Sequence, residues 1–380
     1  MQLKMTRRAL ALTAFAAAAL VTACGGGGGS ATPAKQSISR LIVAGDSLAD
    51  VGTFGAKFTV QNAASPQAGY PIYPEIVGAN FGLSGQCPFF ASTNGTAFTT
   101  RAGCTNYAVG DSAIANPAAK GGTAAPFSVP MQLATALQVA GGAWTPTDLI
   151  LVDGGGNDAR DLITAYLGLA GGAAGLAAYQ TFLAQVLPPA TIAATLPQPN
   201  GPAIAAGLYM TALADSYYNT LKTTLLDKGA THVAVLDMPD VSLTPRFKAV
   251  LGQVATAQGD AAAATLQAAI RTWISAFNTE LANKVAGDAR VAIVPFYADF
   301  TDEVANPAAY ALTNVTTPVC PAVGFPASCL DTTLNAAPPA GAAAGWFSTY
   351  AFADGFHPTP FGHRLLAASI SRALARAGWL

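Results

Sequence analysis

The sequence contains two serines that follow a Gly-Asp pair, Ser47 in Gly45-Asp46-Ser47-Leu48 and Ser112 in Gly110-Asp111-Ser112. A serine hydroxyl becomes a nucleophile when a neighbouring base removes its proton, and that base needs an orienting partner. Ser47 follows an apolar run that ends in glycine, which places it at the end of a predicted strand. Ser47 is therefore a candidate nucleophile, whereas the role of Ser112 depends on its surroundings.

Three histidines are available as the base: His232, His357 and His363. His232 opens a predicted strand and is interpreted as a strand-edge residue. His363 falls inside the last predicted helix, where a solvent-exposed or capping role is expected. His357 lies in the turn-rich segment Asp354-Gly355-Phe356-His357-Pro358. The i, i+3 spacing lets the Asp354 carboxylate fold back onto Nδ1 and leaves Nε2 for a serine, so His357 is the predicted base.

Acyl transfer at a serine also needs donors for the oxyanion of the tetrahedral intermediate. Asn157 follows three glycines, Gly154 to Gly156, so its side chain can project from a tight turn at a strand end. An ordinary turn is the alternative, because glycine and asparagine both favour positive φ. The segment lacks the GxGxxG pattern of a nucleotide site, and no GxSxG nucleophile elbow occurs in the chain.

The elements that must position these residues alternate between apolar strands and helices. Short continuous apolar strands predict a parallel sheet covered on both faces, with ligands at the carboxyl ends of the strands. The predicted fold is α/β, with three α/β/α layers. Strands are expected at 40–44, 148–152, 232–236 and 291–295, and helices at 205–227, 261–285 and 360–377.

Two segments interrupt this alternation, 167–201, rich in Ala, Gly, Leu and Pro, and 318–345, rich in Pro, Ala and Gly. Either segment could shape an acyl pocket or could be a surface insertion, and the two interpretations are equally supported.

The composition excludes one class of partner. Charged residues make up 10 % of the chain, against about 25 % in typical soluble domains. The formal net charge is −1 and no basic block occurs, so nucleic acid is not an expected partner.

The pattern of the N-terminal residues predicts an export signal. Lys4, Arg7 and Arg8 precede an apolar run, Ala9 to Val21, that is short for a membrane span. The sequence Val21-Thr22-Ala23-Cys24 that follows resembles the lipobox of bacterial lipoproteins, in which the chain is cut before a lipidated cysteine. A simple secretory signal with a chance cysteine is the alternative. We therefore expect a signal peptide at 1–23, lipidated Cys24 with a flexible linker at 24–36, and one domain at 37–380.

The other cysteines are Cys87, Cys104, Cys320 and Cys329. An even set in an exported protein favours disulfides, and proximity in the sequence favours Cys87–Cys104 and Cys320–Cys329. A zinc site is the rival interpretation, but no CxxC spacing occurs.

Four segments in order resemble the blocks of the GDSL, or SGNH, hydrolase family. Gly45-Asp46-Ser47-Leu48-Ala49-Asp50 looks like the first block, and Asp50 with Gly52 is similar to the secreted lipase, phospholipase and lecithinase-like branch. The later blocks are similar to Asn106-Tyr107-Ala108-Val109-Gly110, Gly155-Gly156-Asn157-Asp158 and Asp354-Gly355-Phe356-His357.

The resemblance implies a flavodoxin-like fold and a role for each matching residue. Ser47 would be the nucleophile, His357 the base and Asp354 its orienting carboxylate. The oxyanion hole would consist of the backbone N–H groups of Ser47 and Gly110 and the side chain of Asn157. Ser112 then merely follows an oxyanion donor.

The expected function is hydrolysis of acyl esters through an acyl-enzyme, with no metal or organic cofactor. Acyl transfer or phospholipase activity is an alternative within the family, and a non-catalytic surface lipoprotein that binds glycan or lipid is an alternative outside it. The expected partners are a small-molecule or lipid ester and, through Cys24, a membrane. We expect a monomer at the outer membrane, the cell surface or in the periplasm, with release from the cell as an alternative.

Overall fold

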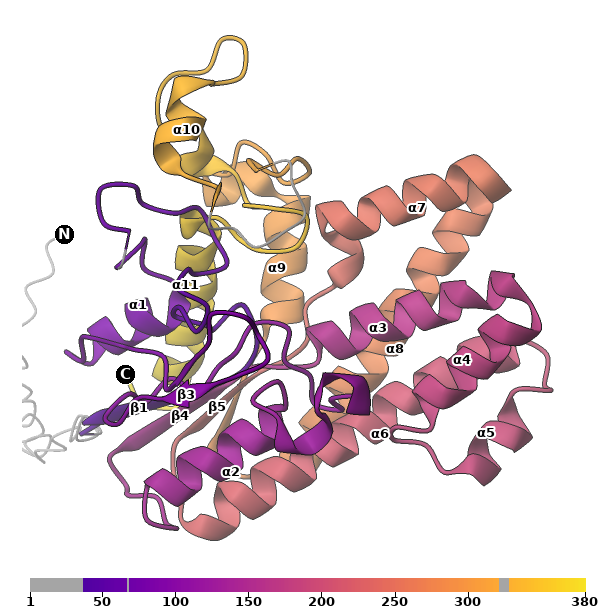
Figure 1. Cartoon of the computed structure of the whole chain (residues 1–380), viewed down its shortest axis with the longest axis horizontal. Helices are drawn as coiled ribbons and strands as arrows, with labels where there is room; N and C mark the ends of the chain where they lie inside the picture. The colour runs from indigo at the N-terminus through magenta and orange to yellow at the C-terminus, as the bar shows by residue number, and fades with distance from the viewer. Residues whose placement is uncertain (1–36, 67, 321–327) are drawn as a thin grey trace, which may run out of the picture. The chain divides into compact units, whose positions relative to one another are not determined.

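A central parallel sheet organises the chain (Figure 1). The computed structural model describes residues 37–66, 68–320 and 328–380, within one compact unit, Gln36–Leu380. The predicted signal peptide, linker and Cys24 lie outside the described residues. The strands run in the order β1 (Arg40–Ala44), β4 (Asp148–Val152), β5 (Val233–Leu236) and β6 (Val291–Val294), and all neighbouring pairs are parallel.

The register brings the carboxyl ends of the strands to one edge of the sheet. Ala44 pairs with Val152 at the ends of β1 and β4, and Leu236 pairs with Val294 at the ends of β5 and β6. The predictions for β1 and β4 match their observed bounds, while β5 starts one residue later than predicted and β6 ends one residue earlier. The predicted α/β class with a parallel sheet flanked by helices is confirmed.

Alternate residues of the strands face two separate hydrophobic cores, because successive side chains in a strand point to opposite faces. Ile42, Ile150 and Val235 belong to the core that contains α2 (Val129–Val139), α6 (Gly201–Thr224) and α8 (Asp260–Val285). Leu41, Leu149 and Leu236 belong to the core that contains α1 (Tyr73–Asn80), α9 (Phe296–Ala305) and α11 (Pro360–Arg376). Helices thus cover both faces of the sheet (Figure 1).

The predicted long helices are present with small shifts at their ends. The helix predicted at 205–227 is α6, which begins at Gly201, directly after Asn200 in the left-handed conformation with φ 55°. The helix predicted at 261–285 begins one residue earlier as α8, and that predicted at 360–377 ends one residue earlier as α11. The other α-helices are α3 (Gly156–Leu167), α4 (Ala173–Leu183), α5 (Pro189–Thr195), α7 (Pro245–Gln258) and α10 (Asp331–Ala336).

Shorter elements complete the chain. A two-stranded antiparallel ribbon is formed by β2 (Phe90–Ala91) and β3 (Thr99–Thr100). Short 3₁₀ turns occur at Ala118–Lys120, Gly122–Ala124, Gly168–Gly171, Leu226–Lys228, Val241–Leu243, Pro307–Tyr310 and Trp346–Thr349. Among the described residues, no helix combines the length and the hydropathy needed to span a bilayer.

Both predicted disulfides are present, Cys87–Cys104 and Cys320–Cys329. The first encloses the β2–β3 ribbon, since its sequence separation of 17 residues brackets both short strands. Cys329 also belongs to a small third core, with Val60, Val319 and Phe347. The Cys87–Cys104 bridge therefore fastens a segment whose two strands are only two residues long each, and two disulfides are consistent with an exported protein.

The ends of β1 and β4 approach each other too closely for any side chain at Gly45. A Cβ atom built on Gly45 would lie 1.4 Å from Oδ1 of Asp153, the residue that follows β4. The same Asp153 Oδ1 accepts a hydrogen bond of 3.0 Å from the Asp46 N–H. Glycine is therefore required at position 45 by contact distance, not by backbone conformation.

We predict that Gly45→Ala lowers the free energy of unfolding by at least about 2 kcal/mol, because the added methyl group must displace the buried Asp153 carboxyl group. Urea unfolding followed by circular dichroism measures this difference. Gly168→Ala is the matched control, since a Cβ at Gly168 meets nothing within 4 Å and its φ is −59°. Equal losses in the two variants would contradict the prediction.

Candidate active site

The Ser47 turn is held by hydrogen bonds on both sides of the serine. The Asp46 N–H donates to Asp153, and the Asp46 carboxylate accepts from the Leu48 N–H at 3.0 Å. The Ala49 N–H closes the turn onto the Asp46 carbonyl at 3.1 Å. No other described residue accepts a hydrogen bond from the Ser47 N–H. Ser47 thus lies in a fixed turn directly after β1, and its N–H has no acceptor among the described residues.

Asp153 holds the Ser47 turn through a hydrogen bond to its backbone. Its Oδ1 accepts from the Asp46 N–H, and its Oδ2 accepts from the Tyr73 hydroxyl at 2.9 Å. Burial, with the nearby Asp46 carboxylate, raises the pKa of Asp153 well above its usual value. Asp153 is a residue that the sequence reasoning missed; an acidic residue directly after a fully apolar strand was the signal available.

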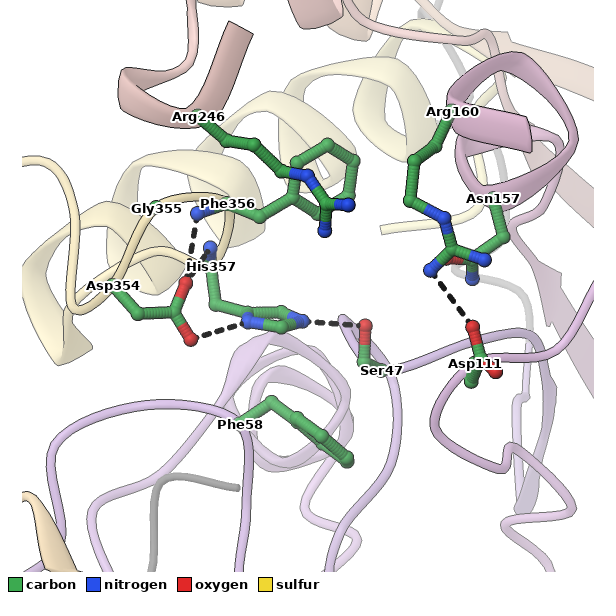
Figure 2. Close-up of a pocket in the computed structure, with 10 residues that line it drawn as sticks. All are labelled: Ser47, Phe58, Asp111, Asn157, Arg160, Arg246, Asp354, Gly355, Phe356 and His357. Atoms are coloured by element: carbon green, nitrogen blue, oxygen red, sulfur yellow. Dashed lines mark hydrogen bonds and ion pairs between the residues drawn. The ribbon is translucent and has the colours of Figure 1, made fainter. Parts of the chain in front are cut away.

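The structure brings Ser47, His357 and Asp354 together in the predicted order (Figure 2). The Ser47 Oγ lies 2.7 Å from His357 Nε2, and His357 Nδ1 lies 2.7 Å from Asp354 Oδ2. With the Nδ1 proton donated to the carboxylate, Nε2 is free to accept the serine proton. This is the arrangement that a nucleophile and its general base require.

The Asp354 carboxylate accepts hydrogen bonds from the backbone of its own turn. Its Oδ1 accepts the backbone N–H groups of Phe356 and His357, each at 2.7 Å. Burial raises the pKa of Asp354, but the hydrogen bond and charge of His357 together with these N–H groups outweigh it, so the net pKa is lowered. The Asp354 carboxylate is therefore ionised at neutral pH and lies in hydrogen-bond contact with the His357 ring.

The other two histidines lie away from Ser47. His232 is buried at the start of β5, its Nδ1 is 3.0 Å from Thr231 Oγ1, and burial lowers its pKa. The solvent-exposed or capping role expected for His363 is wrong. His363 is fully buried in α11 against Tyr73, with ring centroids 6.4 Å apart, and burial lowers its pKa to about 3. The internal face of α11 explains this burial.

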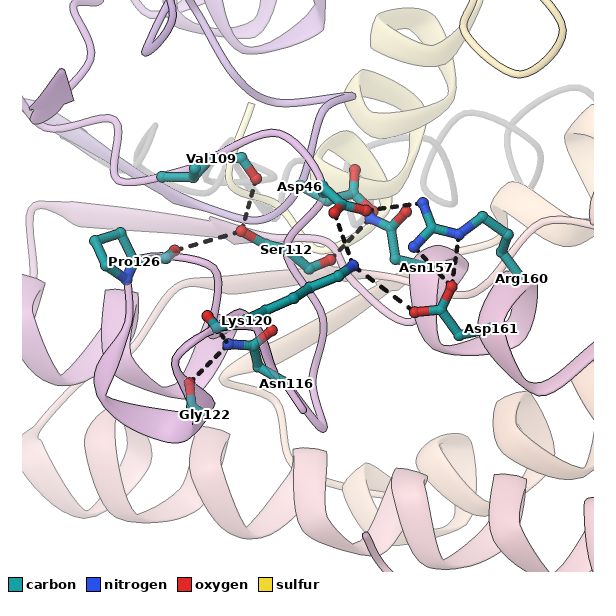
Figure 3. A network of polar contacts seen from close by, with 11 residues as sticks. Asp46, Val109, Ser112, Asn116, Lys120, Gly122, Pro126, Asn157, Arg160 and Asp161 are labelled. Carbon is teal, nitrogen blue, oxygen red and sulfur yellow. Dashed lines mark hydrogen bonds and ion pairs between the residues drawn. The ribbon is translucent and has the colours of Figure 1, made fainter. Parts of the chain in front are cut away.

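Asn157 lies in the first turn of α3, directly after the three glycines, Gly154 to Gly156, that follow Asp153. Its Nδ2 donates to the Ser112 carbonyl at 2.8 Å and makes a long contact of 3.5 Å with Asp46 Oδ2 (Figure 3). An amide nitrogen carries two N–H groups, so the shorter bond fixes the side chain while the second N–H is only weakly engaged. Asn157 also lines the pocket that contains Ser47.

Ser112 has a different environment from Ser47. It is fully buried, and its hydroxyl donates to the Val109 carbonyl at 2.6 Å (Figure 3). The same hydroxyl accepts a hydrogen bond of 2.8 Å from Gln132 Nε2. The Gln132 Oε1 in turn accepts the Gly45 N–H at 2.8 Å. The second Gly-Asp-Ser therefore supports the first through Gln132.

The backbone N–H of Gly110 does not point to a free position. It donates to Asp50 Oδ2 at 2.8 Å, while Asp50 Oδ1 accepts the N–H groups of Gly52 and Thr53. Burial raises the pKa of Asp50 to about 6 despite these three donors. The structure thus corrects the expected oxyanion role of the Gly110 N–H: this group joins the Ser47 segment to the 106–112 segment.

Asp111 lines the pocket in place of Gly110 and adopts a left-handed backbone with φ 67°. No described residue accepts its N–H. Its carboxylate is held by Arg160 at 2.8 Å and by Lys120 at 2.7 Å. Burial raises the pKa of Asp111, but these two cations outweigh it and lower the pKa overall.

These residues surround a pocket of about 370 Å³. Arg160, Arg246, Phe58 and Phe356 also line the pocket, and the sequence analysis gave none of them a role. Phe356 precedes His357 and Arg160 lies one helical turn after Asn157, so their nearness in the sequence was an available signal. Arg246 reaches the pocket through a tertiary contact with Gly355. The described lining contains no residue from 167–201 or 318–345. Within 167–201, α4 and α5 pack against α6 instead. The full lining is Ser47, Phe58, Asp111, Asn157, Arg160, Arg246, Asp354, Gly355, Phe356 and His357 (Figure 2).

Comparison with known proteins identifies a family for this chain. The family model for GDSL-like lipases/acylhydrolases matches residues 41–370, which include Ser47, Asn157 and His357. No curated protein sequence matches the chain at a significant level. Because the family match extends over most of the chain, the protein belongs to the GDSL-like lipase/acylhydrolase family, whose members hydrolyse ester bonds.

Proposed function

We propose that the protein is a serine esterase that hydrolyses carboxylic acyl esters through an acyl-enzyme on Ser47. The observation that carries the proposal is the chain of two 2.7 Å contacts from Ser47 Oγ through His357 to Asp354. This chain opens into a 370 Å³ pocket, so an ester carbonyl can reach the hydroxyl.

In the first step, Ser47 Oγ attacks the ester carbonyl while His357 Nε2 takes the hydroxyl proton. Ionised Asp354 stabilises the resulting imidazolium through Nδ1. The tetrahedral intermediate collapses when His357 gives its proton to the leaving alcohol. Water, deprotonated by the same imidazole, then releases the acid and restores Ser47.

The oxyanion in this mechanism is held by the Ser47 N–H and by the second N–H of Asn157 Nδ2, neither of which has a short intramolecular bond. The Gly110 N–H is occupied by Asp50, so we assign the third donor to the adjacent Asp111 N–H. The ion pairs of the Asp111 carboxylate with Arg160 and Lys120 hold the left-handed backbone that this assignment requires.

Exported location is part of the proposal. The lipobox-like Val21-Thr22-Ala23-Cys24 supports lipidation of Cys24, and the two disulfides support an oxidising compartment. A tethered esterase at the outer membrane or cell surface would act on lipid or small-molecule esters that reach the membrane.

Purified mature protein is expected to hydrolyse 4-nitrophenyl butyrate and to be labelled at Ser47 by a fluorophosphonate, because Ser47 alone of the two candidate serines contacts an imidazole. Ser47→Ala is expected to lower kcat by at least about 10⁴-fold. Peptide mapping of the labelled protein identifies the modified serine. Labelling at Ser112, or substantial activity in Ser47→Ala, would overturn the assignment, and a protein that binds esters without turnover would favour the non-catalytic alternative.

Asn157→Ala is expected to lower kcat by about 10²- to 10³-fold, less than Ser47→Ala, because it removes one oxyanion donor and leaves the nucleophile intact. Steady-state kinetics with 4-nitrophenyl butyrate separate kcat from KM, and KM is expected to change little. Asn116→Ala is the matched control, since the Asn116 amide bonds the carbonyls of Lys120 and Gly122 outside the pocket lining. A loss in kcat no greater than that of Asn116→Ala would remove Asn157 from the oxyanion hole.

Cys24→Ser is expected to move the protein from the membrane fraction to the soluble fraction or the medium, because the serine hydroxyl cannot take the thioether-linked lipid of a lipoprotein. Fractionation of expressing cells, with incorporation of a labelled fatty acid as a second readout, tests this prediction. Unchanged membrane association in the variant would contradict the anchor.

A further inference from the structure

The pocket contains two guanidinium groups in different states. Arg160 is already paired within the protein, since its guanidinium binds Asp111 at 2.8 Å and Asp161 at 2.7 Å. Arg246 is exposed, and its guanidinium makes no hydrogen bond or ion pair with any described residue. Arg246 is therefore a cation that lines the Ser47 pocket and still has its donors available.

The backbone of Arg246 is fixed to the loop that carries His357. The Arg246 N–H donates to the Gly355 carbonyl at 2.8 Å. A Cβ built on Gly355 would lie 3.4 Å from the Arg246 Cβ, so the two chain segments are in contact. Arg246 also lies in the first turn of α7, where there is no acidic residue. The position of the Arg246 backbone relative to the His357 loop is thus set by a main-chain hydrogen bond, while the guanidinium is held by no hydrogen bond to a described residue.

Figure 2 shows the Arg246 side chain extending over the pocket from the Asp354–His357 side, while Arg160 enters from the Asn157 side. Neither carboxylate of the lining can neutralise Arg246. Asp354 is saturated by His357 and two N–H groups, and Asp111 is paired with Arg160 and Lys120. A negative group that pairs with Arg246 must therefore come from outside the pocket lining.

We propose that Arg246 binds an anionic group of the substrate, so that the preferred substrates are esters that also carry a carboxylate or a phosphate. This inference rests on the proposed esterase function of Ser47. The guanidinium fork suits both anions, because its N–H groups can bond two oxygens at once. Because Arg246 is exposed, solvent weakens the ion pair between its guanidinium and a substrate anion. We therefore expect this ion pair to contribute to the selectivity between substrates.

The test compares 4-nitrophenyl butyrate with mono-4-nitrophenyl succinate, which differ by a terminal methyl group against a carboxylate. The measured quantity is the ratio of kcat/KM for the succinate ester to that for the butyrate ester. We expect Arg246→Ala to lower this ratio about tenfold, and Arg246→Lys to give an intermediate value because lysine keeps the charge without the fork. Added salt should lower the ratio in the wild type but not in Arg246→Ala.

A second pair places the anion on the alcohol side: 1-butyrylglycerol and its 3-phosphate. If the ratio falls only for the succinate pair, the anion bound by Arg246 is a carboxylate on the acyl side of the ester. If it falls only for the phosphate pair, the anion is a phosphate on the alcohol side. Either result supports the proposal. Arg364→Ala is the control, since Arg364 is an exposed arginine over the Phe361 ring and outside the pocket lining.

The outcomes separate the two proposals. If the wild type hydrolyses these esters but neither ratio falls more in Arg246→Ala than in Arg364→Ala, the anion site is overturned while the esterase function stands. If the wild type hydrolyses none of the four esters, the esterase proposal fails and the anion site fails with it.

Discussion

The close approach of the ends of β1 and β4 is the constraint on which the site depends. Gly45 has no room for a side chain because the Asp153 carboxyl group occupies that position. From there, Asp153 binds the Asp46 N–H and so fixes the turn that presents Ser47. Ser47 is thus positioned by the neighbouring strand of the sheet, and the sheet register determines its distance from the residues at the other strand ends.

The carboxyl groups around Ser47 differ in their surroundings, in their pKa shifts and in the groups that they bind. Burial raises the pKa values of Asp50 and Asp153, which accept backbone N–H groups and hold turns. Asp354 has its pKa lowered overall, because it faces His357 and two N–H groups of its own turn. Of these three carboxyl groups, only Asp354 contacts the His357 ring, whereas Asp50 and Asp153 hold backbone turns.

The sequence predicted the parts of the molecule that are determined locally. Continuous apolar runs located β1 and β4 with their bounds, and the i, i+3 spacing of Asp354 and His357 placed that pair, because both depend on neighbouring residues. The bond from Gly110 to Asp50 spans 60 residues, and no local pattern shows which acceptor an N–H will meet. The burial of His363 and the arrival of Arg246 at the pocket are likewise consequences of helix packing.

The charged residues at the pocket are of two kinds: most are paired with one another, whereas Arg246 makes no ion pair with a described residue. Arg160, Lys120, Asp111 and Asp161 form a neutral group in which each ion has a partner. Figure 3 shows Lys120, Arg160 and Asp161 of this group. An anion that binds Arg160 or Lys120 must therefore compete with a carboxylate of the protein itself. Arg246 has no internal pair to lose, so an incoming anion is opposed only by hydration of the guanidinium. Selectivity for charge in this pocket therefore depends on the residue that the fold does not use for its own stability.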